Sequence, residues 1–126
     1  MKQKNVYKLD SDDGKAIQLF VKLGMPKNLA KTLLYVSQFD ECKCVDVEQG
    51  TDLCQPEVSV AMQELRRRGW VKKWDLKKKG KGRPVHIYKP TTQLSEILNV
   101  FEQEKLTEVE SVKNDISILR NIILSR

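Results

Sequence analysis

The residues best suited to chemistry lie between Cys54 and Pro90, in the run CQPEVSVAMQELRRRGWVKKWDLKKKGKGRPVHIYKP. From Arg66 to Lys89 there are eleven Lys or Arg residues and one acid, Asp75, so this segment has a net charge of +10. The whole chain carries +6, which leaves −4 for everything outside the segment. Positive charge concentrated in this way indicates a polyanionic partner, and the elements around it favour double-stranded DNA.

The first half of the run predicts an amphipathic helix that begins at Gln55 or Pro56 and ends at Gly69. Three apolar residues at helical spacing form its inward face: Val58, Met62 and Leu65. The outward face carries the residues that we expect to contact DNA: Gln55, Glu57, Ser59, Val60, Gln63, Arg66 and Arg67.

A helix inserted into a major groove contacts base edges mainly with its N-terminal half. Gln55, Ser59 and Gln63 are the predicted base contacts, because Gln can pair with adenine through two hydrogen bonds and Ser accepts several partners. Val60 suits a thymine methyl group. Glu57 either accepts from a cytosine amine or interacts with the positive end of the helix dipole.

After Gly69 the periodicity changes to that of strands, over Trp70–Leu76 and Pro84–Lys89, joined by a turn that contains glycine. We expect the five cations of this turn to contact phosphates: Lys77, Lys78, Lys79, Lys81 and Arg83. Arg83 could instead enter a minor groove. The three arginines before Gly69 either contact DNA or interact with the negative end of the helix dipole.

The aromatic residues of the ribbon favour structural roles. Trp70, at the junction of helix and strand, is expected in the core, and Trp74 and Tyr88 are expected to pack across the two strands. His86 is the single histidine, so a histidine-based metal site is excluded. The sequence contains neither a nucleophile–base motif nor a phosphate-binding glycine loop, so we expect neither enzymatic activity nor a cofactor.

Three further helices are predicted before the basic segment. The first spans Lys15–Leu23, capped by Asp12 or Asp13 and ended by Gly24, and follows an arm over residues 1–13. The second begins at Pro26, in the first turn, and ends near Asp40. The third is short and spans Val45–Gly50, with the glycine as its stop signal.

From Thr92 onward the pattern is helical again, as one bent helix or as two, with Thr107 and Glu110 as a potential capping box. Apolar residues in its second half alternate in steps of three and four, as in paired helices. The predicted dimer interface contains Leu98, Phe101, Val109, Val112, Ile116, Leu119 and Ile123. The alternative is that the same stripe folds back onto the first helices.

Composition sets the frame for these elements. A chain of 126 residues with 40% apolar and 32% charged residues suits one globular domain with an appendage. Its apolar runs are far shorter than the roughly 20 residues of a membrane span, and its first residues do not form a secretory signal. Three cysteines without an export signal favour reduced thiols, so we expect a cytoplasmic protein without membrane partners.

The order helix, helix, short helix, helix, ribbon resembles prokaryotic winged-helix regulators of the MarR, TrmB and arsenic-repressor families, in particular archaeal ones. The similarity rests on VDVEQGTDLCQPEVSVAMQELRRRGWVKK and GRPVHIYKP. It implies a mainly α fold with a small β-ribbon: a winged helix-turn-helix domain over residues 14–90 and a dimerisation region over 91–126. It also implies a homodimeric, sequence-specific transcriptional regulator. The alternative is a winged helix that serves as a protein- or RNA-binding adaptor in a larger assembly.

Cys42, Cys44 and Cys54 carry a minor hypothesis. Some arsenic- and cadmium-sensing repressors hold a soft metal with a Cys-x-Cys pair near this place. Here the pair lies one residue earlier, which turns the thiols by about 100° on a helix. The other interpretation, small apolar side chains without a metal, is the one that we expect.

Overall fold

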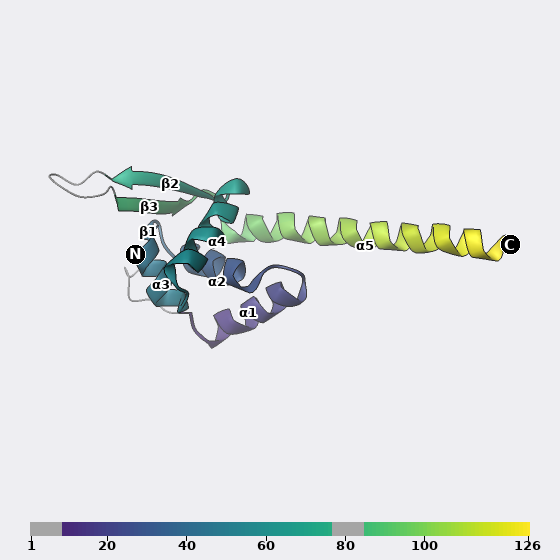
Figure 1. Ribbon diagram of the computed structural model, residues 1–126, viewed down its shortest axis with the longest axis horizontal. Coiled ribbons are helices and arrows are strands. Elements are labelled where there is room, and N and C mark those ends of the chain that lie inside the picture. Colours follow the sequence, from purple (N-terminus) through teal and green to yellow (C-terminus); the bar gives the residue numbers. More distant parts are fainter. Residues whose placement is uncertain (1–8, 77–84) are drawn as a thin grey trace. The chain divides into compact units, whose positions relative to one another are not determined.

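The computed structural model describes residues 9–76 and 85–126 of the chain (Figure 1). The described residues form two compact units, with the boundary between Leu94 and Ser95. The first unit contains, in chain order, α1 (Ser11–Lys22), α2 (Lys27–Val36), β1 (Cys42–Lys43), α3 (Cys44–Thr51), α4 (Gln55–Arg67), β2 (Val71–Leu76) and β3 (Val85–Pro90). A single long helix, α5 (Leu94–Leu124), accounts for the second unit.

The core of the first unit surrounds α2. This helix contacts α1, α3 and α4, and seven of its ten residues are buried. The predicted inward residues of α4 also belong to the core. Val58, Met62 and Leu65 are each at most 1% exposed. The apolar periodicity therefore predicted the buried face of α4 correctly.

The first helix begins earlier than predicted, at Ser11. Its N-cap is Asp10 rather than Asp12 or Asp13: Asp10 Oδ1 accepts from the Asp13 amide at 2.9 Å, and Asp13 Oδ2 accepts from the Asp10 amide at 3.0 Å. This reciprocal capping box satisfies two amide donors and draws residues 11–13, assigned to the arm, into the helix. The predicted end is confirmed, since Gly24 follows the last turn with φ of 104°.

The second helix is shorter than predicted. Pro26 is its N-cap rather than a first-turn residue, and the helix ends at Val36 instead of near Asp40. The hydroxyl of Ser37 donates to the Leu33 carbonyl at 2.8 Å, and the amides of residues 38 and 39 bond three residues back. Residues 37–39 therefore form tighter turns after the helix. The apolar pattern alone does not distinguish such turns from α-helix.

The third helix spans Cys44–Thr51, so Gly50 is not its stop. Its C-cap is Asp52, which adopts the left-handed conformation with φ of 60°. Gly50 is buried inside the helix, and a Cβ added there would overlap ring carbons of Tyr35 from α2. Its role is to allow the close approach of α3 and α2.

The sheet has three antiparallel strands in the order β1-β3-β2, where a two-stranded ribbon was predicted. Lys73 pairs with Tyr88 and Trp74 with Ile87, and on the other side of β3 Cys42 pairs with Tyr88. β1 is two residues long, too short for a period of two to be visible in the sequence. Its pairing ties the segment before α3 to the ribbon.

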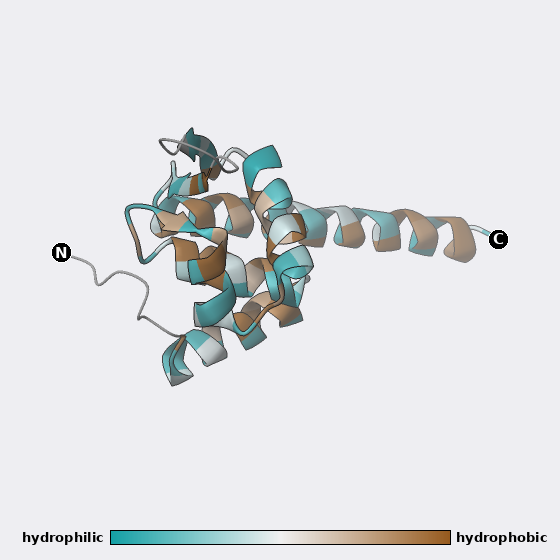
Figure 2. Ribbon diagram, turned by 60° about the vertical axis from the view of Figure 1, so that its left-hand side comes forward, coloured by the Kyte–Doolittle hydropathy of each residue, from teal (hydrophilic) through white to brown (hydrophobic). Residues whose placement is uncertain are grey.

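The C-terminal region is one helix, which settles the choice between one helix and two. Thr107 lies inside it and its hydroxyl donates to the Gln103 carbonyl at 2.9 Å, so the predicted capping box does not form. Apolar residues recur along the length of α5 (Figure 2). Among the described residues, every helix is too short or too polar to cross a membrane.

These elements form a winged helix-turn-helix fold followed by a C-terminal helix, as predicted. α3 and α4 are the paired helices, joined through the left-handed turn at Asp52. The hairpin of β2 and β3 follows α4 directly and contacts it. The fold therefore places the outward face of α4 and the base of the hairpin in the same unit.

Candidate nucleic-acid interface

The outward face of α4 is polar and accessible. Gln55, Gln63, Arg66 and Arg67 are exposed and Ser59 is half-buried, while the opposite stripe of the helix lies in the core. The Gln55 side-chain amide donates to Ser59 Oγ at 2.8 Å. This bond orients both groups and leaves an amide oxygen as acceptor and a hydroxyl hydrogen as donor. A base edge that offers one donor and one acceptor would complement such a pair.

Glu57 is occupied by the helix that carries it. Its Oε1 accepts from the Cys54 amide at 2.9 Å and from the Cys54 thiol at 3.1 Å, and its Oε2 accepts from the side-chain amide of Asn28 at 3.4 Å. The bond from the Cys54 amide is the main cause that lowers the pKa of Glu57. Of its two predicted roles, this geometry favours the one at the positive end of the helix.

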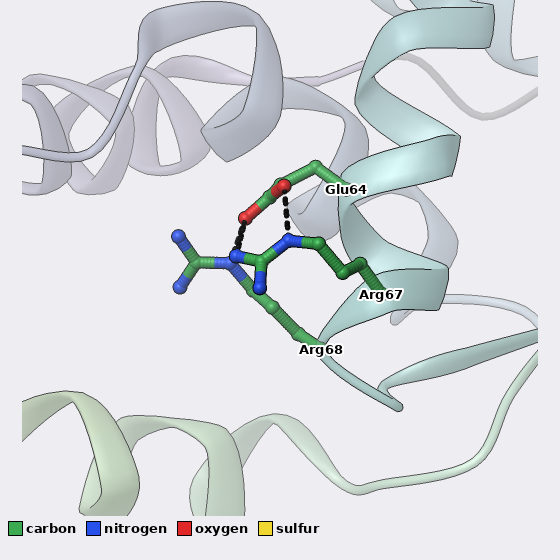
Figure 3. A network of polar contacts seen from close by, with 3 residues as sticks. All are labelled: Glu64, Arg67 and Arg68. Atoms are coloured by element: carbon green, nitrogen blue, oxygen red, sulfur yellow. Dashed lines mark hydrogen bonds and ion pairs between the residues drawn. The ribbon is translucent and has the colours of Figure 1, made fainter.

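The C-terminal turn of α4 contains one carboxylate bound by two guanidinium groups (Figure 3). Glu64 accepts from Arg67 Nε at 2.8 Å and Nη2 at 2.5 Å, and from Arg68 Nε at 2.7 Å. These hydrogen bonds, with that of Arg67 as the largest cause, lower the pKa of Glu64 to about 2. Arg68 also lies over the Trp70 ring, 5.2 Å from its centroid.

Arg66 lies on a different edge of the helix, toward the sheet. Burial raises the pKa of the Tyr88 hydroxyl in β3 to about 12, and the charge of Arg66 acts on that pKa in the opposite direction. Gln55, Ser59 and Arg66 follow one another on this edge, because positions four and seven apart share a side of a helix. The sheet-facing edge therefore combines hydrogen-bonding groups with a cation.

The base of the hairpin adds further cations. Lys72 and Lys89 are exposed, and Lys89 Nζ lies 5.5 Å from the centroid of the Trp74 ring and 3.8 Å from a carboxylate oxygen of Glu41. Across the strands, His86 Nδ1 and Asp75 Oδ1 are 2.6 Å apart. The predicted phosphate contacts at the tip lie outside the described residues: Lys77, Lys78, Lys79, Lys81 and Arg83.

The three aromatic residues of the ribbon divide into a buried pair and an exposed one. Trp70 is 7% exposed and belongs to the core, as predicted. Tyr88 is 6% and Trp74 53% exposed, and they pair with different partners, so the prediction that they pack on each other is wrong. Side chains on adjacent pairs of a ladder point to opposite faces of the sheet.

The cysteines do not gather into a metal site. Cys42 is buried, and burial is the main cause that raises the pKa of its thiol to about 12, while Cys54 is exposed at the start of α4. Burial also raises the pKa of Cys44. Among the described residues, no cluster of three His, Cys, Asp or Glu side chains is placed to hold a metal ion. High thiol pKa values oppose soft-metal capture, which requires thiolates.

An apolar groove of about 540 Å³ between α2 and α4 was missed by sequence reasoning. Pro26 and Leu29 line it from the α2 side, and Pro56, Val60 and Ala61 line it from α4. Val60 is 66% exposed and turns toward this groove rather than toward Gln55 and Ser59. Because the groove forms between two segments about thirty residues apart, no local pattern could reveal it.

The predicted dimer residues lie along α5. Six of the seven are 45–56% exposed: Leu98, Val109, Val112, Ile116, Leu119 and Ile123. Phe101 is 6% exposed and has Lys105 Nζ over its ring at 5.2 Å, so it is already covered in the single chain. A partner could bury more apolar surface at the other six positions.

Solved structures match this fold, whereas no protein-family model and no curated protein sequence matches the chain. TrmBL2, described as an archaeal chromatin protein with a novel mode of DNA binding, has a TM-score of 0.65 and 13% identity over 90% of this chain. The match covers 41% of TrmBL2, so the chain spans less than half of its length.

Two other matches cover most of both chains. A MarR-family transcription regulator has a TM-score of 0.51 and 11% identity over 91% of this chain and 78% of its own. A transcriptional regulator homologue from Pyrococcus horikoshii OT3 has a TM-score of 0.50 and 20% identity over 79% and 95%. At such low identity, the likeness establishes the winged-helix fold and nothing finer.

Proposed function

We propose that this protein is a transcriptional regulator that binds double-stranded DNA as a homodimer, with α4 in the major groove and the hairpin along flanking phosphates. The observation that carries the proposal is the sheet-facing edge of α4. There an oriented Gln55–Ser59 pair shares one side of the helix with the Arg66 cation, whose charge acts on Tyr88 of β3, and α4 contacts β2 of a hairpin that bears lysines. Base-edge donors and acceptors next to phosphate-binding cations are what sequence-specific duplex recognition requires.

The charge distribution on α4 orients it on the duplex. Glu57 and Glu64 lie on the edge that borders the groove to α2. Carboxylates on that edge would be repelled by phosphates, while the sheet-facing edge would be attracted. Gln55, Ser59, Gln63 and Arg66 are therefore the proposed base and backbone contacts, and Glu57 is a helix cap. Arg67 contributes less, because Glu64 offsets its charge.

The structural neighbours support the class of function. TrmBL2 is described as binding DNA, and the two other matches are described as a transcription regulator and a regulator homologue. A two-fold dimer would place two recognition helices about 34 Å apart and so select a pseudo-palindromic operator. The exposed stripe of α5 would supply the interface.

Selection of bound duplexes from a random pool, at stated salt, tests the proposal. We expect a preferred two-fold sequence, and Gln63→Ala should weaken binding to it about ten- to hundredfold by removing a base contact. Gln18→Ala, an equivalent substitution on the exposed face of α1, is the control and should leave affinity unchanged. Preference for single-stranded RNA, or co-purification with a protein instead of DNA selection, would favour the adaptor function.

A further inference from the structure

The second half of α5 presents a short heptad seam to solvent. Val109, Ile116 and Ile123 occupy one core position of the repeat, called a, and Val112 and Leu119 occupy the other, called d. All five side chains are 48–56% exposed. β-branched residues at a, with leucine among the d residues, favour two-stranded pairing.

Charged residues flank this seam in a regular order. Glu108 and Asp115 occupy the g positions before Val109 and Ile116, and Ile122 precedes Ile123. Lys113 and Arg120 occupy the e positions after Val112 and Leu119. One side of the seam is thus acidic and the other is basic. Within the described part of the chain, Lys113, Asp115 and Arg120 form no ion pair, and Glu108 has only an exposed pair with Lys105 at 3.2 Å.

Parallel and antiparallel pairing place different charges opposite one another. In a parallel coiled coil each g residue faces the e residue five positions later in the partner, so Glu108 meets Lys113 and Asp115 meets Arg120. In an antiparallel coil g faces g and e faces e, which places acids against acids and bases against bases. Only the parallel arrangement pairs every flanking charge with its opposite.

We propose that α5 pairs with the α5 of a second copy of this chain as a parallel, two-stranded coiled coil over residues 108–123. This inference deepens the proposed homodimer and rests on it. The seam does not extend further back, because Glu102 and Lys105 fall at a and d and would each face a like charge. In a parallel coil both winged-helix units connect to the same end of the coil, whereas an antiparallel coil connects them to opposite ends.

Charge reversal on one side distinguishes the two directions. In Lys113→Glu/Arg120→Glu, e and g are both acidic, so the four interchain pairs of a parallel dimer would be replaced by repulsion. We expect its dissociation constant at low salt to rise about tenfold or more, measured by sedimentation equilibrium. An antiparallel dimer, where like charges already face one another, would keep its dissociation constant, and that result would overturn the proposal.

The matched control exchanges the two sides of the seam. Glu108→Lys, Lys113→Glu, Asp115→Arg and Arg120→Glu together restore every g–e pair with reversed sign. This variant should dimerise as wild type does, and circular dichroism should show equal helix content in all three proteins. Failure of the exchange variant to dimerise, with its helix content retained, would reject the assignment of charge as the determinant of direction.

A covalent readout measures direction without altering the seam. A Gly-Gly-Cys extension after Arg126 should form an interchain disulfide in a glutathione redox buffer, because a parallel coil holds both C-termini together. The unextended chain, with its exposed Cys54, is the background control. A dimer without this disulfide would overturn parallel pairing.

DNA binding is measured separately on the same proteins. A monomer that binds duplex DNA would overturn the coiled coil and leave the DNA-binding proposal intact. A parallel dimer that does not bind duplex DNA would support the coiled coil and reject that function.

Discussion

At the scale of single residues, the acids of α4 decide how its cations can act. Glu64 binds both Arg67 and Arg68, and Glu57 closes the start of the helix. Arg66, on the sheet-facing edge, is the arginine outside this network. The run of three arginines in the sequence therefore contains residues with different environments, which their adjacency in the sequence does not reveal.

The Glu64 network predicts a strongly acidic carboxyl group. Its lowered pKa means that the network stabilises the folded protein fully above the ordinary value of 4.5 and that this contribution disappears as pH falls toward about 2. NMR titration of the side-chain carboxyl carbon should give a pKa near 2 in wild type and a value closer to 4.5 in Arg67→Gln/Arg68→Gln. An ordinary value in the wild-type protein would contradict the network.

At the scale of elements, helix ends follow local chemistry and helix contacts do not. Gly69 ends α4 as predicted, with φ of 80°, and the Trp70 amide bonds back to the Leu65 carbonyl. Gly50 is also a glycine but does not end its helix. The Tyr35 ring of α2 occupies the space that a side chain at position 50 would fill. Whether a glycine ends a helix or allows two helices to pack closely therefore depends on the residues around it and not on the residue type.

Two glycine-to-alanine substitutions separate these effects. Gly50→Ala should lower the free energy of unfolding by about 1–3 kcal/mol, because a methyl group must displace the Tyr35 ring. In Gly14→Ala the added Cβ meets nothing within 4 Å, so the substitution should raise stability by up to about 1 kcal/mol through helix propensity. Urea denaturation of both variants provides the measurement, and equal effects would contradict the packing role of Gly50.

At the scale of the whole molecule, positive charge is concentrated in one segment of a chain whose remainder is acidic. The helix proposed to enter the major groove and the hairpin belong to the same unit, so a duplex bound to one is within reach of the other. Phosphate contacts release counterions and make affinity depend on salt. The salt dependence of binding therefore reports how many hairpin cations take part.

Replacing Lys77, Lys78, Lys79, Lys81 and Arg83 together by Gln tests this role. For every phosphate that the hairpin no longer binds, the slope of log affinity against log salt should decrease in magnitude by about 0.9. Gln63→Ala, a proposed base contact, should lower affinity and leave the slope unchanged. An unaltered slope in the fivefold variant would reject the hairpin as a phosphate-binding element.

Features that depend on neighbours along the chain could be predicted from the sequence. The spacing of Val58, Met62 and Leu65 identified the buried face of α4, and a change of period located the hairpin strands, because both follow from the geometry of a single element. The exposed seam of α5 was recognised in the same way. The capping box of Asp10 was missed because Asp12 and Asp13 offered the same local chemistry.

Which distant groups meet could be learned only from the folded chain. β1 forms because Cys42 pairs with Tyr88, and Gly50 allows close packing against the Tyr35 ring of another helix. The apolar groove is lined by Leu29 of α2 and Val60 of α4. Such contacts depend on how complete elements pack, since burial and shape act between segments remote in sequence. A periodic pattern specifies which face of an element is buried, whereas only the tertiary structure determines which other element packs against that face.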